Sequence, residues 1–259
     1  MIELIIGITI FSIIQSIFGV GLLLFGTPTL LLIGYSYSET LWILLPCSVI
    51  ISLIQTVNEY DLVRAKKKVA YFTIPTMILS LVFVVSYDHV LDINKIVGSF
   101  LLFIGIVMLS PKLQAYLQIF VETQLKPYYV FIGLVHGVSN MGGGPLSILM
   151  STIYHSKAKI RANIAFTYLI LVLLQLIVLV VLDANGLKYV NINLMLISLS
   201  MYLITNKYIS HKVNNEKYRI LINVLHIFIV TWVNYFNLRI NNGTIISSSI
   251  NPPCPPFKT

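Results

Sequence analysis

Apolar residues occupy eight long segments of this chain, and short polar loops separate the segments. The segments are residues 2–34, 41–57, 69–87, 93–110, 128–153, 163–182, 189–206 and 218–237. A helix needs about 20 apolar residues to cross the hydrocarbon core of a bilayer, and most of these segments approach or exceed that length. The pattern therefore predicts an all-α polytopic integral membrane protein.

Two of the segments are interrupted by residues that weaken a helix. The first is too long for one span and contains Gly19, Gly21 and Pro28, and the fifth contains HGVSNMGGGP, residues 136–145. Each glycine costs a helix roughly 1 kcal/mol, and Pro145 disfavours helical backbone at the residue before it. Open backbone at membrane depth is tolerated only inside protein or beside a wet cavity. The two interruptions therefore predict broken helices, which often mark the binding site of a transporter.

The charges of the loops predict how these segments cross the membrane. Lys and Arg collect in loops 58–68, 111–127, 154–162 and 207–217, whereas loops 87–95 and 183–188 do not share that excess. Basic loops stay in the cytoplasm, so basic loops on both sides of the fifth segment indicate that it enters and leaves by the cytoplasmic face. The same reasoning places both ends of the first segment outside. We expect each broken segment to form a re-entrant hairpin.

The chain then divides into two inverted repeats, each a Gly/Pro-broken helix or re-entrant hairpin followed by three transmembrane helices. The boundaries are residues 1–110, a cytoplasmic connection at 111–127, and residues 128–240. Weak internal similarity agrees, because QSIFGVG from Gln15 and HGVSNMG from His136 align at an offset of 121, and Gln55 and Gln175 lie 120 apart. Eight full crossings in parallel repeats are the alternative. Residues 241–259 contain SSS and NPPCPP and are predicted to be disordered.

Composition narrows the functional class. The chain is 57% hydrophobic and 10% charged, with a net charge of +8. The basic residues lie in loops, where they set topology and contact anionic lipid, so the charge does not indicate a nucleic-acid partner. Cys47 and Cys254 make neither a metal-binding spacing nor a disulfide framework, and no cofactor is expected. The glycine run lacks the Lys-Ser/Thr pair of a nucleotide-binding loop.

The two interrupted segments resemble the sulfite exporter TauE/SafE family. HGVSNMGGGPLSILM followed by KAKIRANIAF is similar to the second Gly-rich, Pro-ended stretch of that family, and QSIFGVGLLLFGTPTLLL is similar to the first. The first copy departs from the pattern, because Leu22 to Leu24 stand where glycines are expected. The resemblance covers roughly residues 4–237. It implies an inner-membrane transporter of small anions such as sulfite, sulfonates or organosulfur compounds.

The chemistry of the two stretches suits a small oxyanion. A glycine-rich half-helix start offers free N–H groups and partial positive charge, and neutral side chains add donors without binding too tightly. The candidate substrate-binding residues are Gln15, Gly19, Gly21, Gln55, His136, Ser139, Asn140, Gly142, Gly143, Gly144, Pro145, Ser147 and Gln175. The structural alternative is that the glycines allow close helix packing and the glutamines form interhelical hydrogen bonds.

The sequence therefore predicts a membrane transporter, not an enzyme, which moves a small anion by alternating access around two Gly-Pro broken helices. Its expected surroundings are the lipid bilayer of the inner membrane, with a homo-oligomer left open. The alternatives are a non-transporting membrane subunit and a membrane-embedded enzyme or assembly factor. The scattered histidines offer no reactive constellation that favours an enzyme.

Overall fold

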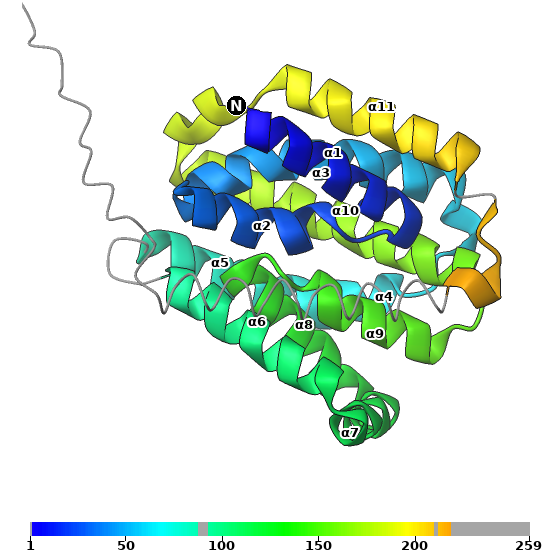
Figure 1. The fold of residues 1–259 in the computed structure, drawn as a ribbon. Helices are drawn as coiled ribbons and strands as arrows, with labels where there is room; N and C mark the ends of the chain where they lie inside the picture. The colour runs from blue at the N-terminus through cyan, green and yellow to red at the C-terminus, as the bar shows by residue number, and fades with distance from the viewer. Residues whose placement is uncertain (1, 88–92, 210–211, 219–259) are drawn as a thin grey trace, which may run out of the picture.

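The computed structural model describes residues 2–87, 93–209 and 212–218, and the elements of this part of the chain are all helical (Figure 1). Two of the helix pairs are hairpins built from a broken apolar segment. The first consists of α1 (Ile2–Phe18) and α2 (Leu22–Ile33), and the second of α8 (Leu125–Ser139) and α9 (Gly143–Ile153). The sequence prediction of two broken helices is therefore confirmed.

Local signals set the limits of the first hairpin and the following span, α3 (Tyr37–Asn58). α2 ends at Gly34, which adopts the left-handed conformation (φ +104°) that closes many helices. Ser36 then caps α3, because its hydroxyl accepts the Glu39 N–H while the Glu39 carboxylate accepts the Ser36 N–H. This turn reverses the chain within a few residues.

The rest of the first half contains one interrupted span and two further helices. A short 3₁₀ turn, η1 (Tyr60–Leu62), leads to a continuous helical stretch made of α4 (Lys66–Lys68), the π-helical η2 (Val69–Thr73) and α5 (Ile74–Ser86). α6 (Ile93–Leu109) follows, and α7 (Pro111–Thr123) lies across the end of the bundle. Residues 111–123, which we expected to be part of a loop connection, are helical. Ser110 caps that helix and Pro111 occupies its first position.

The second half continues from the second hairpin with α10 (Lys157–Leu182), the 3₁₀ turn η3 (Ala184–Tyr189) and α11 (Ile192–Tyr208). α8 packs closely on α5. Added Cβ atoms at Gly133 and Gly137 would lie 2.1 Å from Thr76 Oγ1 and 2.0 Å from Ser80 Oγ. Small residues and hydroxyls commonly bring membrane helices this close.

The two hairpins enter the bundle from opposite ends (Figure 1). Contacts along α10 measure how far each reaches. The first break, at Gly19, contacts the Arg161 carbonyl and Ile164, whereas the second hairpin contacts Tyr168 and Gln175. With a rise of about 1.5 Å per residue, Ile164 and Gln175 are about 16 Å apart along the helix axis. Each hairpin therefore reaches past the tip of the other.

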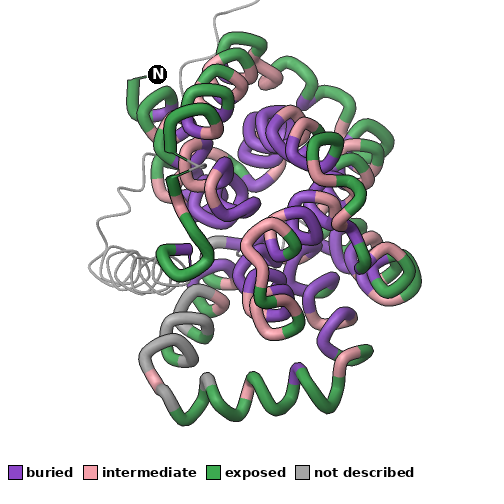
Figure 2. Tube along the Cα trace, turned by 90° about the vertical axis from the view of Figure 1, so that its right-hand side faces the viewer, coloured by how far each residue is buried: buried purple, intermediate pink, exposed green. Residues whose placement is uncertain are grey.

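The distribution of side chains is that of a protein in lipid. Buried residues gather on the inner faces of the helices and exposed ones lie at the periphery (Figure 2). Large apolar side chains are exposed, whereas many polar ones, including Gln15, Gln55, His136, Asn140 and Gln175, are buried. Such polar groups avoid the hydrocarbon by facing the bundle interior.

Among the described residues, three helices have the length and composition to cross a membrane: Tyr37–Asn58, Lys66–Ser86 and Lys157–Leu182. The shorter apolar helices Ile2–Phe18, Leu22–Ile33 and Gly143–Ile153 belong to the two hairpins, as expected for half-helices. The predicted segment 218–237, apart from Tyr218, and the predicted disordered tail 241–259 lie outside the described residues.

Candidate functional site

The first hairpin break is held together by the side chain of Gln15. Its Nε2 donates to Ser48 Oγ and Ser52 Oγ, both at 3.1 Å, and its Oε1 accepts the Leu22 N–H at 3.2 Å. Gln55 Nε2 adds bonds to the backbone carbonyls of Gln15 and Ser16, each at 3.1 Å. The N-terminus of α2, which carries partial positive charge, is therefore already capped by the protein itself.

The second hairpin break repeats this backbone geometry at the offset of 121. Gly19 N–H donates to Gln15 O and Asn140 N–H donates to His136 O, both at 2.8 Å. Both residues have positive φ, +82° at Gly19 and +60° at Asn140. At the start of each second half-helix, the Phe25 N–H donates to Gly21 O at 2.9 Å and the Leu146 N–H to Gly142 O at 3.0 Å. The internal alignment made from sequence thus corresponds to a repeated three-dimensional structure.

The side chains around the second break are also paired with a neighbouring span. His136 Nε2 lies 3.1 Å from Gln175 Oε1, so this nitrogen carries the proton as the amide is placed. Asn140 Nδ2 donates to Thr27 Oγ1 of α2 at 3.0 Å. Gln55 and Gln175 therefore occupy equivalent positions, because each binds its own hairpin at the last turn before the break.

Two glycines of the run allow a close approach to the N-terminus of α9. A Cβ at Gly142 would lie 2.6 Å from His136 Cβ, and one at Gly143 would lie 1.9 Å from the Tyr168 hydroxyl. The His136 and Tyr168 rings are 5.5 Å apart. His136 and Tyr168 therefore lie against the start of α9, and Gln175 binds His136; we call these three residues with Asn140 the second-tip cluster.

The second-tip cluster contains polar atoms without a partner in the described structure. They are His136 Nδ1, Asn140 Oδ1, Tyr168 OH and Gln175 Nε2. All four residues are completely buried. Leaving a buried polar group unpaired costs about 1–3 kcal/mol, so four in one place mark a site able to bind a polar ligand.

Other predicted site residues have different roles in the structure. The hydroxyls of Ser139 and Ser147 donate at 2.8 Å to the carbonyls of Val135 and Gly143, one turn earlier in their own helices. Gly144 and Pro145 lie in the first turn of α9. The expectation that Pro145 keeps Gly144 out of the helix is wrong, because first-turn N–H groups need no intrahelical acceptor and glycine has no Cβ to clash. Gly21 is needed because a Cβ there would lie 2.7 Å from the Gln15 nitrogen.

Sequence reasoning missed Tyr168, Thr27 and Ser48. Tyr168 sits in an apolar run and has no local signal of its own. The internal repeat supplies such a signal. Ser48 and Gln55 lie seven residues apart on α3. Tyr168 and Gln175 lie seven residues apart on α10, and the two pairs are related by the same offset of 120. Residues seven apart share a helix face, so both pairs point at a hairpin.

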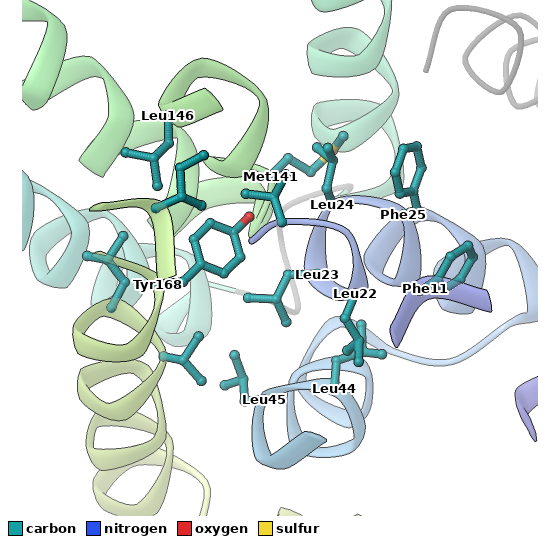
Figure 3. Packing of buried hydrophobic residues seen from close by; sticks show 14 of the residues in the cluster. Phe11, Leu22, Leu23, Leu24, Phe25, Leu44, Leu45, Met141, Leu146 and Tyr168 are labelled. Atoms are coloured by element: carbon teal, nitrogen blue, oxygen red, sulfur yellow. The ribbon is translucent and has the colours of Figure 1, made fainter. Parts of the chain in front are cut away.

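An apolar layer separates the two breaks. Leu22 and Leu23 of α2 pack beside Met141 and Tyr168, with Leu44 and Leu45 of α3 below them in the view (Figure 3). These side chains are at most 1% exposed. Leu22 and Leu23, which stand where the family pattern has glycines, therefore form part of the apolar layer between the two hairpin breaks.

Comparison with known families agrees with this architecture, since the model for Sulfite exporter TauE/SafE matches residues 4–233. The chain belongs to that family. No curated protein and no solved structure matches it. As a TauE/SafE protein, it is a multi-pass membrane transporter of anions from a family of transporters, not enzymes. Among the described residues, no three His, Cys, Asp or Glu side chains are grouped to hold a metal ion.

Proposed function

We propose that this TauE/SafE protein carries a small sulfur oxyanion, sulfite or a sulfonate, across the inner membrane. The observation that carries the proposal is the second-tip cluster, where unpartnered polar atoms surround the N-terminus of a half-helix inside the bundle. The partial positive charge of such a terminus favours an anion, while the side chains of the cluster supply the donors, because the Gly144 N–H already donates to the Met141 carbonyl at 3.3 Å and Pro145 has none.

The polar atoms of the cluster match the groups of hydrogensulfite, the singly protonated form of sulfite, whereas a sulfonate, which carries no proton, would use the donors alone. Tyr168 OH and Gln175 Nε2 are donors that suit the oxygens of the ligand, and Asn140 Oδ1 and His136 Nδ1 are acceptors that suit its hydroxyl. All four groups are uncharged when the histidine is neutral. A site without a fixed charge binds an anion weakly enough to release it, as transport requires.

Alternating access fits the arrangement of the hairpins. The first hairpin and its apolar residues Leu22 and Leu23 close the path towards the end of the bundle that carries the basic loops 58–68 and 154–162. The second hairpin closes the path towards the opposite end. Movement of one hairpin against its supporting span opens one path at a time. A non-transporting subunit and a membrane-embedded enzyme remain the alternatives, and no described feature favours either.

The test compares two tyrosine-to-phenylalanine variants. Tyr168→Phe removes a buried hydroxyl whose proton has no acceptor in the described structure, so we expect nearly unchanged thermal stability and about tenfold weaker sulfite transport, measured as radiolabelled flux into proteoliposomes. Tyr128→Phe removes a hydroxyl that donates to the Pro145 carbonyl at 3.1 Å, so it should lower stability and leave the apparent sulfite affinity unchanged.

Opposite effects of the two variants on transport and on stability distinguish ligand binding from packing. Equal sulfite flux in the Tyr168→Phe variant and the wild type would show that the cluster does not bind the anion. Absence of sulfite flux in the wild type, with flux of another anion in a panel of sulfonates and carboxylates, would change the substrate class.

A further inference from the structure

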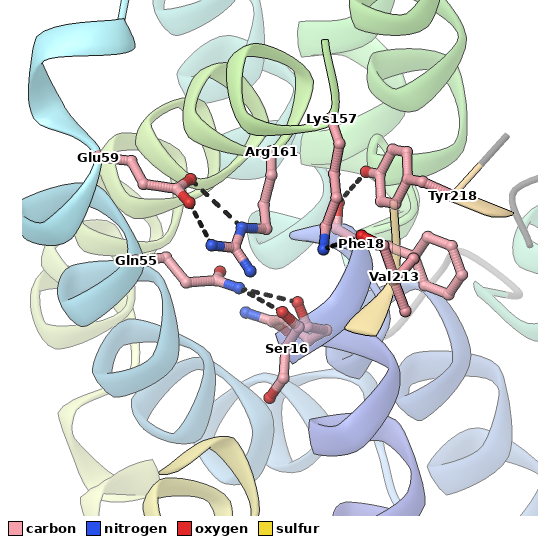
Figure 4. A network of polar contacts seen from close by, with 9 residues as sticks. Ser16, Phe18, Gln55, Glu59, Lys157, Arg161, Val213 and Tyr218 are labelled. Carbon is pink, nitrogen blue, oxygen red and sulfur yellow. Dashed lines mark hydrogen bonds and ion pairs between the residues drawn. The ribbon is translucent and has the colours of Figure 1, made fainter. Parts of the chain in front are cut away.

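A second group of charged residues lies at the end of the bundle where the basic loops meet. Arg161, in the first turns of α10, pairs with Glu59 at the end of α3 through two contacts: Nη2 with Oε1, and Nε with Oε2 at 3.3 Å (Figure 4). The two side chains are only 12% and 14% exposed. A guanidinium bound to a carboxylate through two of its nitrogens presents the geometry that it uses for any planar or pyramidal oxyanion.

The pair does not serve to attach the loop after α3, because Asn163 already does so. Asn163 Oδ1 accepts the Arg64 and Ala65 N–H groups at 2.7 and 2.9 Å, and its Nδ2 donates to the Leu62 and Lys159 carbonyls. A largely buried ion pair contributes little net stability, since desolvation of both charges offsets their attraction. The position of the pair therefore suggests a role other than anchoring.

The pair lies directly over the tip of the first hairpin. The Arg161 carbonyl is 3.4 Å from the position of a Cβ at Gly19, so the break packs against the backbone of Arg161. Gln55, one turn before Glu59, holds the carbonyls of Gln15 and Ser16. Glu59 and Arg161 thus join α3 to α10 across the end of the path that the first hairpin closes.

The surroundings of the pair are positively charged. Lys157 lies one turn before Arg161, where its Nζ donates to the Val213 carbonyl at 2.9 Å, and Tyr218 OH donates to the Phe18 carbonyl at 3.3 Å. Two cations and one carboxylate leave a local charge of about +1, which raises the concentration of small anions at this end.

We propose that Arg161 is an oxyanion-binding residue at the basic mouth of the transporter, where the Glu59 carboxylate occupies its guanidinium until a small oxyanion replaces it. This proposal rests on the proposed anion transport. Replacement separates α3 from α10 above the first hairpin while Gln55 keeps its hold on that hairpin. The anion then lies about 10 Å along α10 from Tyr168, given seven residues at about 1.5 Å each.

Sulfite-dependent thermal unfolding of the purified full chain in detergent measures binding without transport. Glu59→Gln removes the competing charge at nearly constant shape, so the half-saturating sulfite concentration should fall about tenfold, as expected when a competing carboxylate is removed. Arg161→Lys keeps the positive charge but loses the paired N–H donors of the guanidinium, so it should raise the half-saturating sulfite concentration about fivefold. Arg64→Lys is the matched control at the same end, because Arg64 donates to the Asp61 and Val63 carbonyls, and it should bind as the wild type does.

Measuring Glu59→Gln in the Tyr168→Phe variant separates the role of Arg161 from that of the second-tip cluster. The gain from Glu59→Gln should persist in Tyr168→Phe, because the two changes affect different positions on α10. If Glu59→Gln does not fold, Glu59→Asp, which shortens the reach of the carboxylate, should lower the half-saturating concentration about threefold.

Unchanged or weaker sulfite binding in the Glu59 variants, or wild-type binding in Arg161→Lys, overturns the role of Arg161 and leaves the proposed function intact. No response of the wild type to any anion overturns both proposals.

Discussion

The close approach of α9 to Tyr168 predicts the effect of adding a single methyl group to the site. In Gly143→Ala the new Cβ would lie 1.9 Å from the Tyr168 hydroxyl, whereas ordinary contact begins at 3.4 Å. The hydroxyl must retreat by about 1.5 Å, and because Tyr168 is completely buried its ring has to move against packed neighbours. Overpacking of this kind costs about 1–3 kcal/mol, and we expect about 2 kcal/mol together with loss of sulfite flux.

The same geometry predicts a partial rescue. In Gly143→Ala combined with Tyr168→Phe, the nearest atom becomes the ring carbon Cζ at 2.9 Å, which needs to move by only about 0.5 Å. We expect a favourable coupling of about 1 kcal/mol in a double-mutant cycle. Thermal unfolding in detergent measures all four proteins, while flux should remain low in the double variant because the hydroxyl is gone.

Gly7→Ala is the matched control for helix propensity. Its Cβ would meet Phe11 at 3.5 Å, an ordinary contact, so the change should be neutral or stabilising by up to about 1 kcal/mol. The reasoning is refuted if Gly143→Ala is as stable as Gly7→Ala, or if removing the Tyr168 hydroxyl recovers no stability.

Two further predictions concern the loop anchor and the membrane topology. Asn163→Ala leaves the Arg64 and Ala65 N–H groups unpaired, so it should destabilise the protein by about 2–3 kcal/mol while the sulfite affinity of the folded fraction is unchanged; weaker affinity at normal stability would contradict this. Cysteines introduced at the exposed residues His155 and Asn185 should react with a membrane-impermeant maleimide from opposite sides, His155→Cys from the cytoplasm; labelling of His155→Cys from the outside only would exclude the inverted arrangement.

Much of the fold could be predicted because each signal is local. Apolar runs give the helices, Gly19 and the run beginning at Gly142 give the breaks, and loop charges give hairpins that enter from opposite ends. Part of the candidate site could also be predicted from the sequence, since a polar residue in an apolar run, such as His136 or Gln175, must face the interior of the bundle. The predicted domain boundaries and the predicted orientation of the chain in the membrane stay predictions.

The amino-acid pattern is sufficient to predict an all-helical membrane protein with two broken helices, because hydrophobicity and backbone preference act over a few residues. Which polar groups have partners follows from the packing of the helices. Gln15 and His136 are equivalent in the repeat, but both ends of the Gln15 amide have partners, on α2 and α3, whereas His136 keeps an unpartnered nitrogen. Pairing depends on atoms brought together from distant segments, and no local pattern records that Tyr168 faces Gly143 or that Arg161 faces Glu59.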